Sequence, residues 1–256
     1  MSAGDVLFMN HILRVLFSAY LWLMIVLINL GITIAAVVSS LLFYPIDPDR
    51  KIAHRICEGW GRGVLLASPG WRLKIQGRGY IRDGKSYVLV ANHSSLSDII
   101  YLYHLGKQFK WMAKESLFWI PFFGWAMSAA GYIRLVRGKH GSIRDSFDKS
   151  VEWLGRNISI LIFPEGTRNR SGGLGAFKNG PFKLAIRTQK PIVPIVLTGT
   201  RETIQKGSLF FSYRINCKLK VLKPIPTDGY LENQYLELGN LVRHQMLEAI
   251  ELLEGK

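Results

Sequence analysis

The fold class of this chain is indicated by one stretch of its sequence, Tyr87-Val88-Leu89-Val90-Ala91-Asn92-His93-Ser94-Ser95-Leu96-Ser97-Asp98. Its apolar beginning predicts a buried strand, and Ser95 or Ser97 is expected to cap a helix that begins near Asp98. A strand that leads directly into a helix is typical of α/β proteins, which commonly bind ligands at the carboxyl ends of their strands. The stretch therefore predicts an α/β fold with His93 at the carboxyl end of a strand.

The same alternation of short apolar runs and longer amphipathic segments extends from about residue 70 to the end of the chain. Strands are predicted at residues 72–76, 87–91, 110–113, 132–136, 159–163, 192–197 and 213–221. Helices are predicted at residues 98–105, 143–154, 178–188 and 236–253. This order of elements predicts a mixed sheet flanked by helices.

The N-terminal part of the chain has a different character. Residues 15–46 contain no Asp, Glu, Lys, Arg or His, and this run exceeds the roughly 20 residues that a helix needs to cross a bilayer core. A second, basic amphipathic helix is expected after Asp47, with Pro48 at its first position, packed either on a membrane surface or on the protein's own core. We therefore expect membrane-anchoring helices over residues 1–67, either spanning or interfacial, ahead of an α/β domain over residues 68–256.

The charge and cysteine content narrow the choice of partners. The formal net charge is +15, which favours anions such as lipid headgroups, phosphorylated substrates or nucleic acid. No nucleic-acid reading motif is present, so nucleic acid is not an expected partner.

Lys and Arg follow the apolar run and are nearly absent before it, which places the C-terminal portion in the cytoplasm. Cys57 and Cys217 form no disulfide framework and are expected to be reduced thiols.

The first motif with chemical content pairs His93 with Asp98. A carboxylate on one ring nitrogen fixes the tautomer of the imidazole and leaves the other nitrogen free to accept a proton. Two alternatives stand beside this interpretation. Ser94, Ser95 or Ser97 could be the nucleophile of a Ser-His-Asp hydrolase, although the Gly-x-Ser-x-Gly elbow is absent, or the motif could be a capped helix with an incidental histidine. No second histidine or acidic cluster has metal-ligand spacing, so no metal is expected.

The second motif follows another apolar strand and reads Phe163-Pro164-Glu165-Gly166-Thr167-Arg168. Arg168 offers a planar guanidinium that suits phosphate, and the helix expected to begin near Lys178 presents free N–H groups that also favour an anion. Arg134 and Arg137, near the end of the strand at residues 132–136, could add positive charge. The alternative is a surface ion pair between Glu165 and Arg168.

Together these residues resemble the membrane-bound glycerolipid acyltransferases, most closely the bacterial 1-acyl-glycerol-3-phosphate acyltransferases. That family carries four ordered sequence blocks, and all four are found here. They are Asn92-His93 with Asp98, Gly131 with Arg137, Phe163-Pro164-Glu165-Gly166-Thr167-Arg168, and Pro191-Ile192-Val193-Pro194-Ile195-Val196. The chain departs from the family at Val136, where relatives often have an acidic residue.

The resemblance implies an enzyme that transfers an acyl chain from acyl-CoA or acyl-acyl-carrier-protein to the free sn-2 hydroxyl of 1-acyl-glycerol 3-phosphate, giving phosphatidic acid. It implies that His93 is the general base and that Asp98 orients it. It also implies an acceptor-binding set that comprises Arg137, Glu165, Gly166, Thr167, Arg168 and Lys178, in which Glu165 orients Arg168 or contacts the glycerol.

No cofactor or metal is implied. The partners implied are the thioester donor, the lysophospholipid acceptor and membrane lipids, at a bacterial cytoplasmic (inner) membrane with the active domain on its cytoplasmic face. Two alternatives stay open: a related acyltransferase that uses glycerol 3-phosphate or a lyso-aminolipid, and a non-catalytic membrane scaffold that binds lipid. Acyl-donor and acceptor profiling would separate them.

Overall fold

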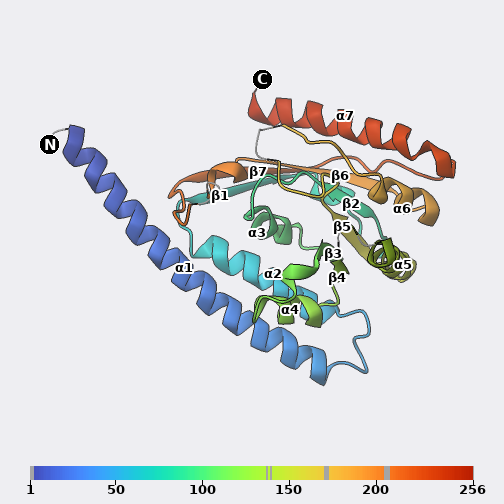
Figure 1. Ribbon diagram of the computed structural model, residues 1–256, viewed down its shortest axis with the longest axis horizontal. Coiled ribbons are helices and arrows are strands. Elements are labelled where there is room, and N and C mark those ends of the chain that lie inside the picture. Colours follow the sequence, from blue (N-terminus) through green and yellow to red (C-terminus); the bar gives the residue numbers. More distant parts are fainter. Residues whose placement is uncertain (1–2, 137, 139, 170–172, 205–207, 256) are drawn as a thin grey trace.

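The structure is a computed structural model that describes residues 3–136, 138, 140–169, 173–204 and 208–255. Within these residues seven strands form one sheet in the order β1-β7-β6-β2-β5-β3-β4 (Figure 1). Their bounds are β1 Trp71–Gln76, β2 Val88–Ala91, β3 Phe109–Lys114, β4 Ile133–Leu135, β5 Ser159–Ile162, β6 Ile192–Thr198 and β7 Ile215–Val221. The five neighbouring strands from β6 to β4 are parallel to one another. β7 pairs antiparallel with β6, and β1 pairs with β7 in parallel. The predicted mixed sheet is confirmed.

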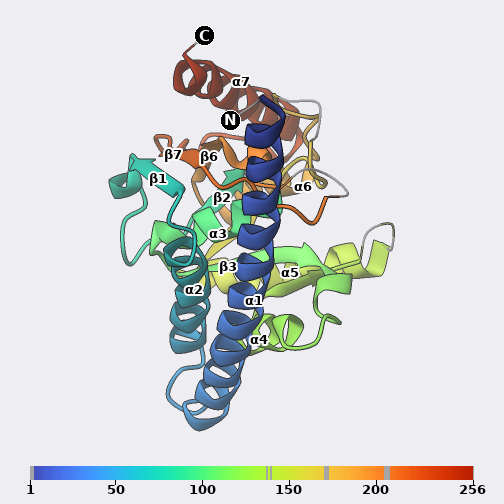
Figure 2. The same cartoon turned by 90° about the vertical axis from the view of Figure 1, so that its left-hand side faces the viewer.

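Helices cover both faces of this sheet, as Figures 1 and 2 show. One layer contains α1 (Ala3–Leu42), α2 (Lys51–Leu66), α3 (Asp98–Leu102) and α4 (Phe123–Ala129), and the other contains α5 (His140–Gly155), α6 (Gly180–Thr188) and α7 (Tyr235–Glu254). Single 3-10 turns lie between them: η1 Arg78–Tyr80, η2 Tyr103–Leu105, η3 Glu115–Leu117, η4 Thr200–Glu202 and η5 Glu232–Gln234.

The central strands explain why the sheet needs two helical layers. All four residues of β2 are buried. Leu89 and Ala91 belong to the core under α1–α4, whereas Val88 and Val90 belong to the core under α5–α7. Because successive side chains of a strand point to opposite faces, an uninterrupted apolar strand must be covered on both sides.

The N-terminal helix α1 begins well before the charge-free run and ends at Leu42. It is long and apolar enough to cross a membrane by length and composition, and only 17% of its most apolar window is buried. Its inner face contacts the domain at widely separated points: Phe17 packs on the Tyr213 ring, Trp22 Nε1 donates to Leu209 O, and Thr33 Oγ1 donates to Phe122 O. The helix therefore lies along the domain, and its opposite face is exposed (Figure 2).

The second helix begins later than the sequence predicts. α2 starts at Lys51, and Pro48 lies in the turn that precedes the helix rather than at its first position. Asp47 still caps the helix from that turn, since its carboxylate accepts hydrogen bonds from the N–H groups of Lys51 and Ile52 at 2.9 and 2.8 Å. One face of α2 is buried against the protein's own core; a Cβ added at Gly61 would lie 2.7 Å from Ile100 O of α3.

Candidate active site

The two chemical motifs meet because their strands are neighbours. β2 and β5 are parallel and adjacent, with Val90 in register with Ile162, so the loops after both strands emerge at the same edge of the sheet. Backbone hydrogen bonds join these loops directly: Asn169 N donates to His93 O at 2.8 Å. The structure thus brings the His93 loop onto the Glu165 turn, as expected for ligand sites at the carboxyl ends of parallel strands.

The imidazole of His93 is held in one tautomer. Its Nδ1 lies 2.8 Å from Oδ2 of Asp98, a carboxylate that is fully buried. The same oxygen accepts the N–H groups of Ser94 and Ser95 at 2.8 and 2.9 Å. Because an ionised carboxylate only accepts hydrogen bonds, Nδ1 carries the proton and Nε2 keeps its lone pair. This is the arrangement that a general base requires.

Asn92 has a structural task beside this base. Its side-chain amide donates to Leu197 O at 2.9 Å, and its Oδ1 accepts Leu197 N–H at 2.7 Å. The side chain therefore continues the pairing of β2 with β6 after the backbone of β2 has turned away. The first and fourth sequence blocks are held together in this way.

The serines do not form a nucleophile–base pair with His93. Ser97 Oγ donates to Ser95 Oγ at 3.0 Å and lies 3.3 Å from Thr200 O, and both serines are buried. Ser97 is the first residue before α3, but its side chain makes no capping hydrogen bond; Asp98 accepts the loop N–H groups instead. In the described part of the chain no serine hydroxyl is hydrogen-bonded to His93, so the geometry of a Ser-His-Asp hydrolase is not found.

Glu165 joins the loop after β2 to the loop after β5, in which it lies itself. Its Oε1 accepts the N–H of His93 at 2.9 Å and its Oε2 accepts the N–H of Gly175 at 2.8 Å, while the side chain is 5% exposed. A Cβ added at Gly175 would lie 2.7 Å from Oε2, so any other residue there would displace the Glu165 carboxylate. The surface ion pair considered as an alternative is not seen among the described residues: Glu165 is buried and its partners are backbone N–H groups.

The predicted cationic residues gather around the same turn where the structure describes them. Gly166 has a φ of +68°, which a glycine adopts without strain, and Arg168 follows it, half-buried. Lys178 donates its backbone N–H to Pro164 O at 2.7 Å, and its side chain packs beside Gly166. Arg137 lies outside the described residues.

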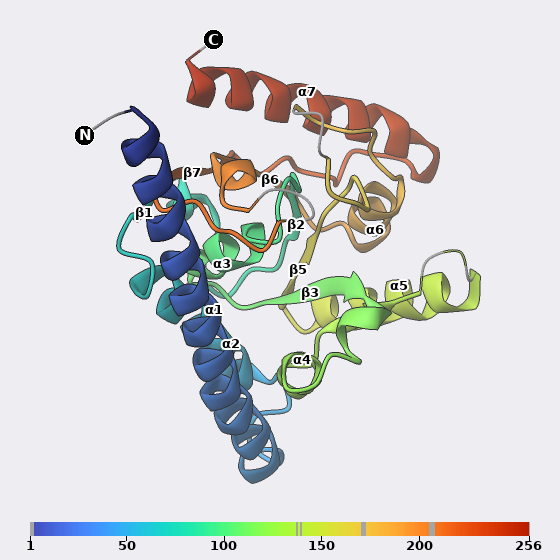
Figure 3. The same ribbon diagram turned by 60° about the vertical axis from the view of Figure 1, so that its left-hand side comes forward.

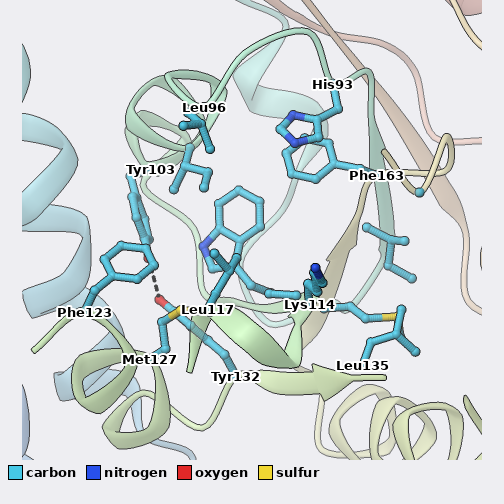
Figure 4. Close-up of a pocket in the computed structure, with 16 residues that line it drawn as sticks. His93, Leu96, Tyr103, Lys114, Leu117, Phe123, Met127, Tyr132, Leu135 and Phe163 are labelled. Atoms are coloured by element: carbon cyan, nitrogen blue, oxygen red, sulfur yellow. Dashed lines mark hydrogen bonds between the residues drawn. The ribbon is translucent and has the colours of Figure 1, made fainter. Parts of the chain in front are cut away.

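An apolar cavity of about 140 Å³ opens beside His93 (Figure 4). The Phe163 ring stacks on the imidazole with a centroid distance of 4.0 Å and an interplanar angle of 14°. From there the cavity extends to Tyr103 and Tyr132 at the opposite end, and its walls include Trp111, Leu117, Phe123 and Met127. The imidazole of His93 thus lies at one end of an apolar cavity.

The far end of the cavity is closed by a buried polar chain. Tyr103 OH donates to Tyr132 OH at 3.2 Å, Tyr132 OH lies 3.0 Å from His54 Nδ1, and His54 Nε2 lies 3.1 Å from Lys107 O. Since a carbonyl only accepts, Nε2 carries the proton of a neutral imidazole and Nδ1 accepts from Tyr132. Burial, with the charge of Lys110 as a smaller cause, lowers the pKa of His54 to about 3, in keeping with this neutral form.

Sequence reasoning did not find the residues of the cavity wall or Lys114 at its edge. Lys114 ends β3, whose carboxyl end lies at the same edge of the sheet as His93, so the strand-end rule applied to residues 110–113 would have indicated it. Arg134, considered as an extra phosphate ligand, instead donates to Ser128 Oγ and lies over the Phe118 ring. Among the described residues, no group of three or more His, Cys, Asp or Glu could hold a metal ion.

Comparisons with known proteins point to one family. The family model described as acyltransferase matches residues 72–198. A chloroplastic 1-acyl-sn-glycerol-3-phosphate acyltransferase of Arabidopsis thaliana is 37% identical over 186 residues, which is 72% of this chain and 51% of the relative. The human 1-acyl-sn-glycerol-3-phosphate acyltransferase alpha is 33% identical over 180 residues, which is 70% of this chain and 63% of the relative. The chain thus spans about half to two thirds of the length of these relatives.

A solved structure shows the same fold. The crystal structure of the 1-acyl-sn-glycerophosphate acyltransferase from Thermotoga maritima matches with a TM-score of 0.82 and 24% sequence identity, over 96% of this chain and 98% of that one. The likeness includes the long N-terminal helix as well as the sheet and its helical layers, which confirms the predicted fold class.

Proposed function

The chain belongs to the acyltransferase family, and from this premise we propose that it transfers an acyl chain from a thioester to the free sn-2 hydroxyl of 1-acyl-glycerol 3-phosphate, giving phosphatidic acid. The observation that carries the proposal is the juxtaposition of a carboxylate-oriented imidazole, an apolar cavity and a basic turn. Each of these three features has a task in acyl transfer.

The proton is handled by His93. Its Nε2 removes the proton of the acceptor hydroxyl while the hydroxyl oxygen attacks the thioester carbonyl, and Asp98 stabilises the imidazolium that forms through the 2.8 Å contact with Nδ1. When the carbon–sulfur bond breaks, the imidazolium returns the proton to the leaving thiolate. The step balances without a covalent enzyme intermediate, in keeping with the Ser97 hydroxyl, which is hydrogen-bonded to Ser95 and Thr200 and not to the imidazole.

The apolar cavity suits the acyl chain of the donor. The thioester carbonyl must lie beside Nε2, and a chain that extends from it into the cavity passes Phe163 and Trp111 and ends near Tyr103 and Tyr132. Each methylene removed from water contributes about 0.8 kcal/mol, so such a channel supplies much of the binding energy for a long chain.

The phosphate of the acceptor is assigned to the basic turn. Arg168 follows Gly166 in the turn and the Lys178 side chain packs beside Gly166, while Arg137 belongs to the same set by the resemblance of its sequence block. Gly166 and Thr167 form the turn itself. Glu165 positions the turn relative to His93 rather than the guanidinium of Arg168. A guanidinium that binds phosphate through two N–H groups would place the sn-2 hydroxyl within reach of the base.

The enzyme is assigned to a membrane, because both lipids of the reaction reside there and because α1 exposes an apolar face along the domain. The contacts of α1 with the domain favour a helix that lies in one leaflet over one that spans the bilayer. The positive charge after α1 favours the cytoplasmic face of a bacterial inner membrane, and the donor is acyl-CoA or acyl-acyl-carrier-protein.

The proposal is tested by His93→Ala in detergent-solubilised protein with a labelled thioester and 1-acyl-glycerol 3-phosphate. Loss of the general base should lower turnover by about 10²–10⁴-fold. His244→Ala, in an exposed histidine of α7, is the matched control and should retain full activity. Near-normal transfer by folded His93→Ala, or a stoichiometric acyl-serine that is passed to the acceptor, would contradict the mechanism.

A further inference from the structure

The segment from η3 to the end of α4 exposes large apolar side chains on its outer surface. Trp119 is 72% exposed, Trp125 54%, Ile120 46% and Phe122 41%. Exposed apolar residues that occur singly need no explanation, but four within seven positions form a contiguous patch that marks an interaction surface.

The inner face of the same segment lines the cavity beside His93. Leu117, Phe123 and Met127 contribute to its wall, and Phe118 is buried in the core beneath α1–α4. The segment is therefore apolar on both sides, so that one thin wall separates the acyl cavity from whatever covers the outer patch.

The backbone supports the outward position of these rings. Phe122 has a φ of +63°, a conformation that is costly for a bulky residue, and its carbonyl accepts a hydrogen bond from Thr33 of α1 at 3.0 Å. Its ring packs against Trp125 with a centroid distance of 5.0 Å. The strained residue thus holds the patch against α1.

The patch continues the exposed face of α1. α4 packs beside the C-terminal half of α1 (Figure 3), where Ile34, Val38 and Leu41 are exposed. Lys114 and Arg134 flank the segment with positive charge. Tryptophan is enriched at membrane interfaces, where its ring is in apolar surroundings and its N–H remains wet, and nearby basic residues favour anionic headgroups.

We propose that residues 115–129 form a second membrane contact, in which Trp119, Ile120, Phe122 and Trp125 enter the same leaflet as α1 and bring the wall of the cavity against lipid. The assignment of a long acyl chain to the cavity rests on the proposed function; the membrane contact does not. An acyl chain then passes between bilayer and cavity at this wall without crossing water.

The contact is tested with an environment-sensitive fluorophore attached to Trp119→Cys of the full-length protein. Cys57 and Cys217 are buried, and burial raises the pKa of both thiols, that of Cys57 to about 12, so neither competes for the label at neutral pH. Leu236→Cys is the matched control, because it is an equally apolar, exposed position on α7, across the sheet from α4 (Figure 1).

On vesicles of phosphatidylethanolamine and phosphatidylglycerol, the label at 119 should shift to the blue and be quenched by lipids that carry a nitroxide in the acyl chain, and the label at 236 should do neither. If vesicle-bound protein leaves the label at 119 in water, the proposal is overturned. A blue shift without vesicles that depends on protein concentration would assign the patch to a second copy of the chain and would also overturn it.

A second experiment separates this contact from the chemistry. Trp119→Ser with Trp125→Ser should lower turnover of a long-chain, vesicle-embedded acceptor on the order of tenfold, and leave turnover of a short-chain, water-soluble acceptor and thioester unchanged. An equal loss of turnover with both kinds of substrate, or no loss with either, contradicts the passage of an acyl chain from the bilayer into the cavity at this wall. If wild-type protein transfers no acyl chain at all, the proposed function fails while the fluorophore result still decides the membrane contact.

Discussion

At the scale of single residues, the proposed role of His93 as general base depends on the groups that hold its side chain and its backbone. Asp98 holds Nδ1, the loop N–H groups of Ser94 and Ser95 hold Asp98, and Glu165 holds the backbone of His93 itself. Asp98 is fully buried, and three donors contact its Oδ2, whereas its Oδ1 has no hydrogen-bond partner among the described residues. The imidazole that we propose as the base is therefore held in position before substrate arrives.

The phosphate assignment is tested at Arg168. Arg168→Ala should raise the KM for 1-acyl-glycerol 3-phosphate and lower kcat/KM by roughly ten- to a hundredfold, because a charged hydrogen bond contributes about 1.5–3 kcal/mol, while the KM for the thioester changes little. Arg168→Lys should restore little of this loss, since an ammonium lacks the planar fork. Arg144→Ala, on the exposed side of α5, should leave both parameters unchanged; unchanged acceptor kinetics in Arg168→Ala would contradict the assignment.

A second prediction concerns pH and the neutral His54 below the cavity. Its pKa is about 3 in the folded protein and about 6.5 when exposed, so between these values the unfolded chain binds more protons and the free energy of unfolding falls as the pH falls. Stability is full above pH 6.5, and the loss below it approaches 1.4 kcal/mol per pH unit, about the value for one proton. In denaturant titrations from pH 7 to 4, His54→Gln should show a shallower decline than wild type; parallel curves would show that His54 does not titrate on unfolding.

At the scale of elements, the sequence predicted every strand of the sheet, with bounds that differ by no more than two residues. Apolar runs such as residues 158–163 predict strands clearly because a strand covered on both faces is short and almost entirely apolar; Ser159 is the single polar residue of this run. α4 was not predicted, because the segment Phe118-Trp119-Ile120-Pro121-Phe122-Phe123-Gly124-Trp125 is apolar on both faces and has no helical period. Position in the fold, rather than composition, decides that its outer rings are exposed.

The candidate site was predictable to a similar degree. His93, Asp98 and the Glu165 turn could be found because their residue types and spacing carry chemistry, whereas their meeting depends on β2 and β5 being neighbours. The partners of Glu165 could not be foreseen, since both are backbone N–H groups: that of Gly175 lies in its own loop, and that of His93 in the loop after β2. The start of α2 was missed because Asp47 caps it from a turn earlier than the usual position.

This unusual cap supplies the prediction at the element scale. Asp47→Ala removes the acceptor of two N–H groups in the first turn of α2 and should lower the free energy of unfolding by about 0.5–2 kcal/mol. Asp47→Asn keeps one acceptor oxygen and should lose less. Asp83→Ala is the control, since Asp83 makes a single exposed contact to Lys107; equal small effects of both alanine variants would mean that the cap does not stabilise α2.

At the scale of the whole molecule, charge and apolar surface act on the membrane in different ways. The net charge of +15 attracts anionic lipid at a distance, and this attraction is screened by salt. The exposed apolar face of α1 binds the membrane by burying its apolar area in lipid, and salt does not weaken this interaction. The full-length protein should therefore remain on membranes through a high-salt wash.

Charged substitutions on the exposed face of α1 should remove this resistance to salt. Val26→Lys with Ile34→Lys places two charges on the exposed side of α1 and should convert the protein into one that salt releases from vesicles, as measured by flotation. Leu252→Lys, at an exposed position of α7, should not change the retention. If salt alone releases the wild-type protein, α1 is not the anchor.

The position of β1 has a consequence for how the chain is made. β1 forms one edge of the sheet beside β7, and more than half of the chain lies between the two strands. Closing so long a loop is entropically costly, and during synthesis at about 5–20 residues per second β1 waits roughly ten seconds or more for its neighbour. Throughout that interval α1 and α2 have been synthesised, whereas the sheet on which they pack has not yet formed. A lipid surface that takes up the apolar face of α1 at this stage would protect the nascent chain from aggregation, so that the same helix serves biogenesis before it serves substrate access.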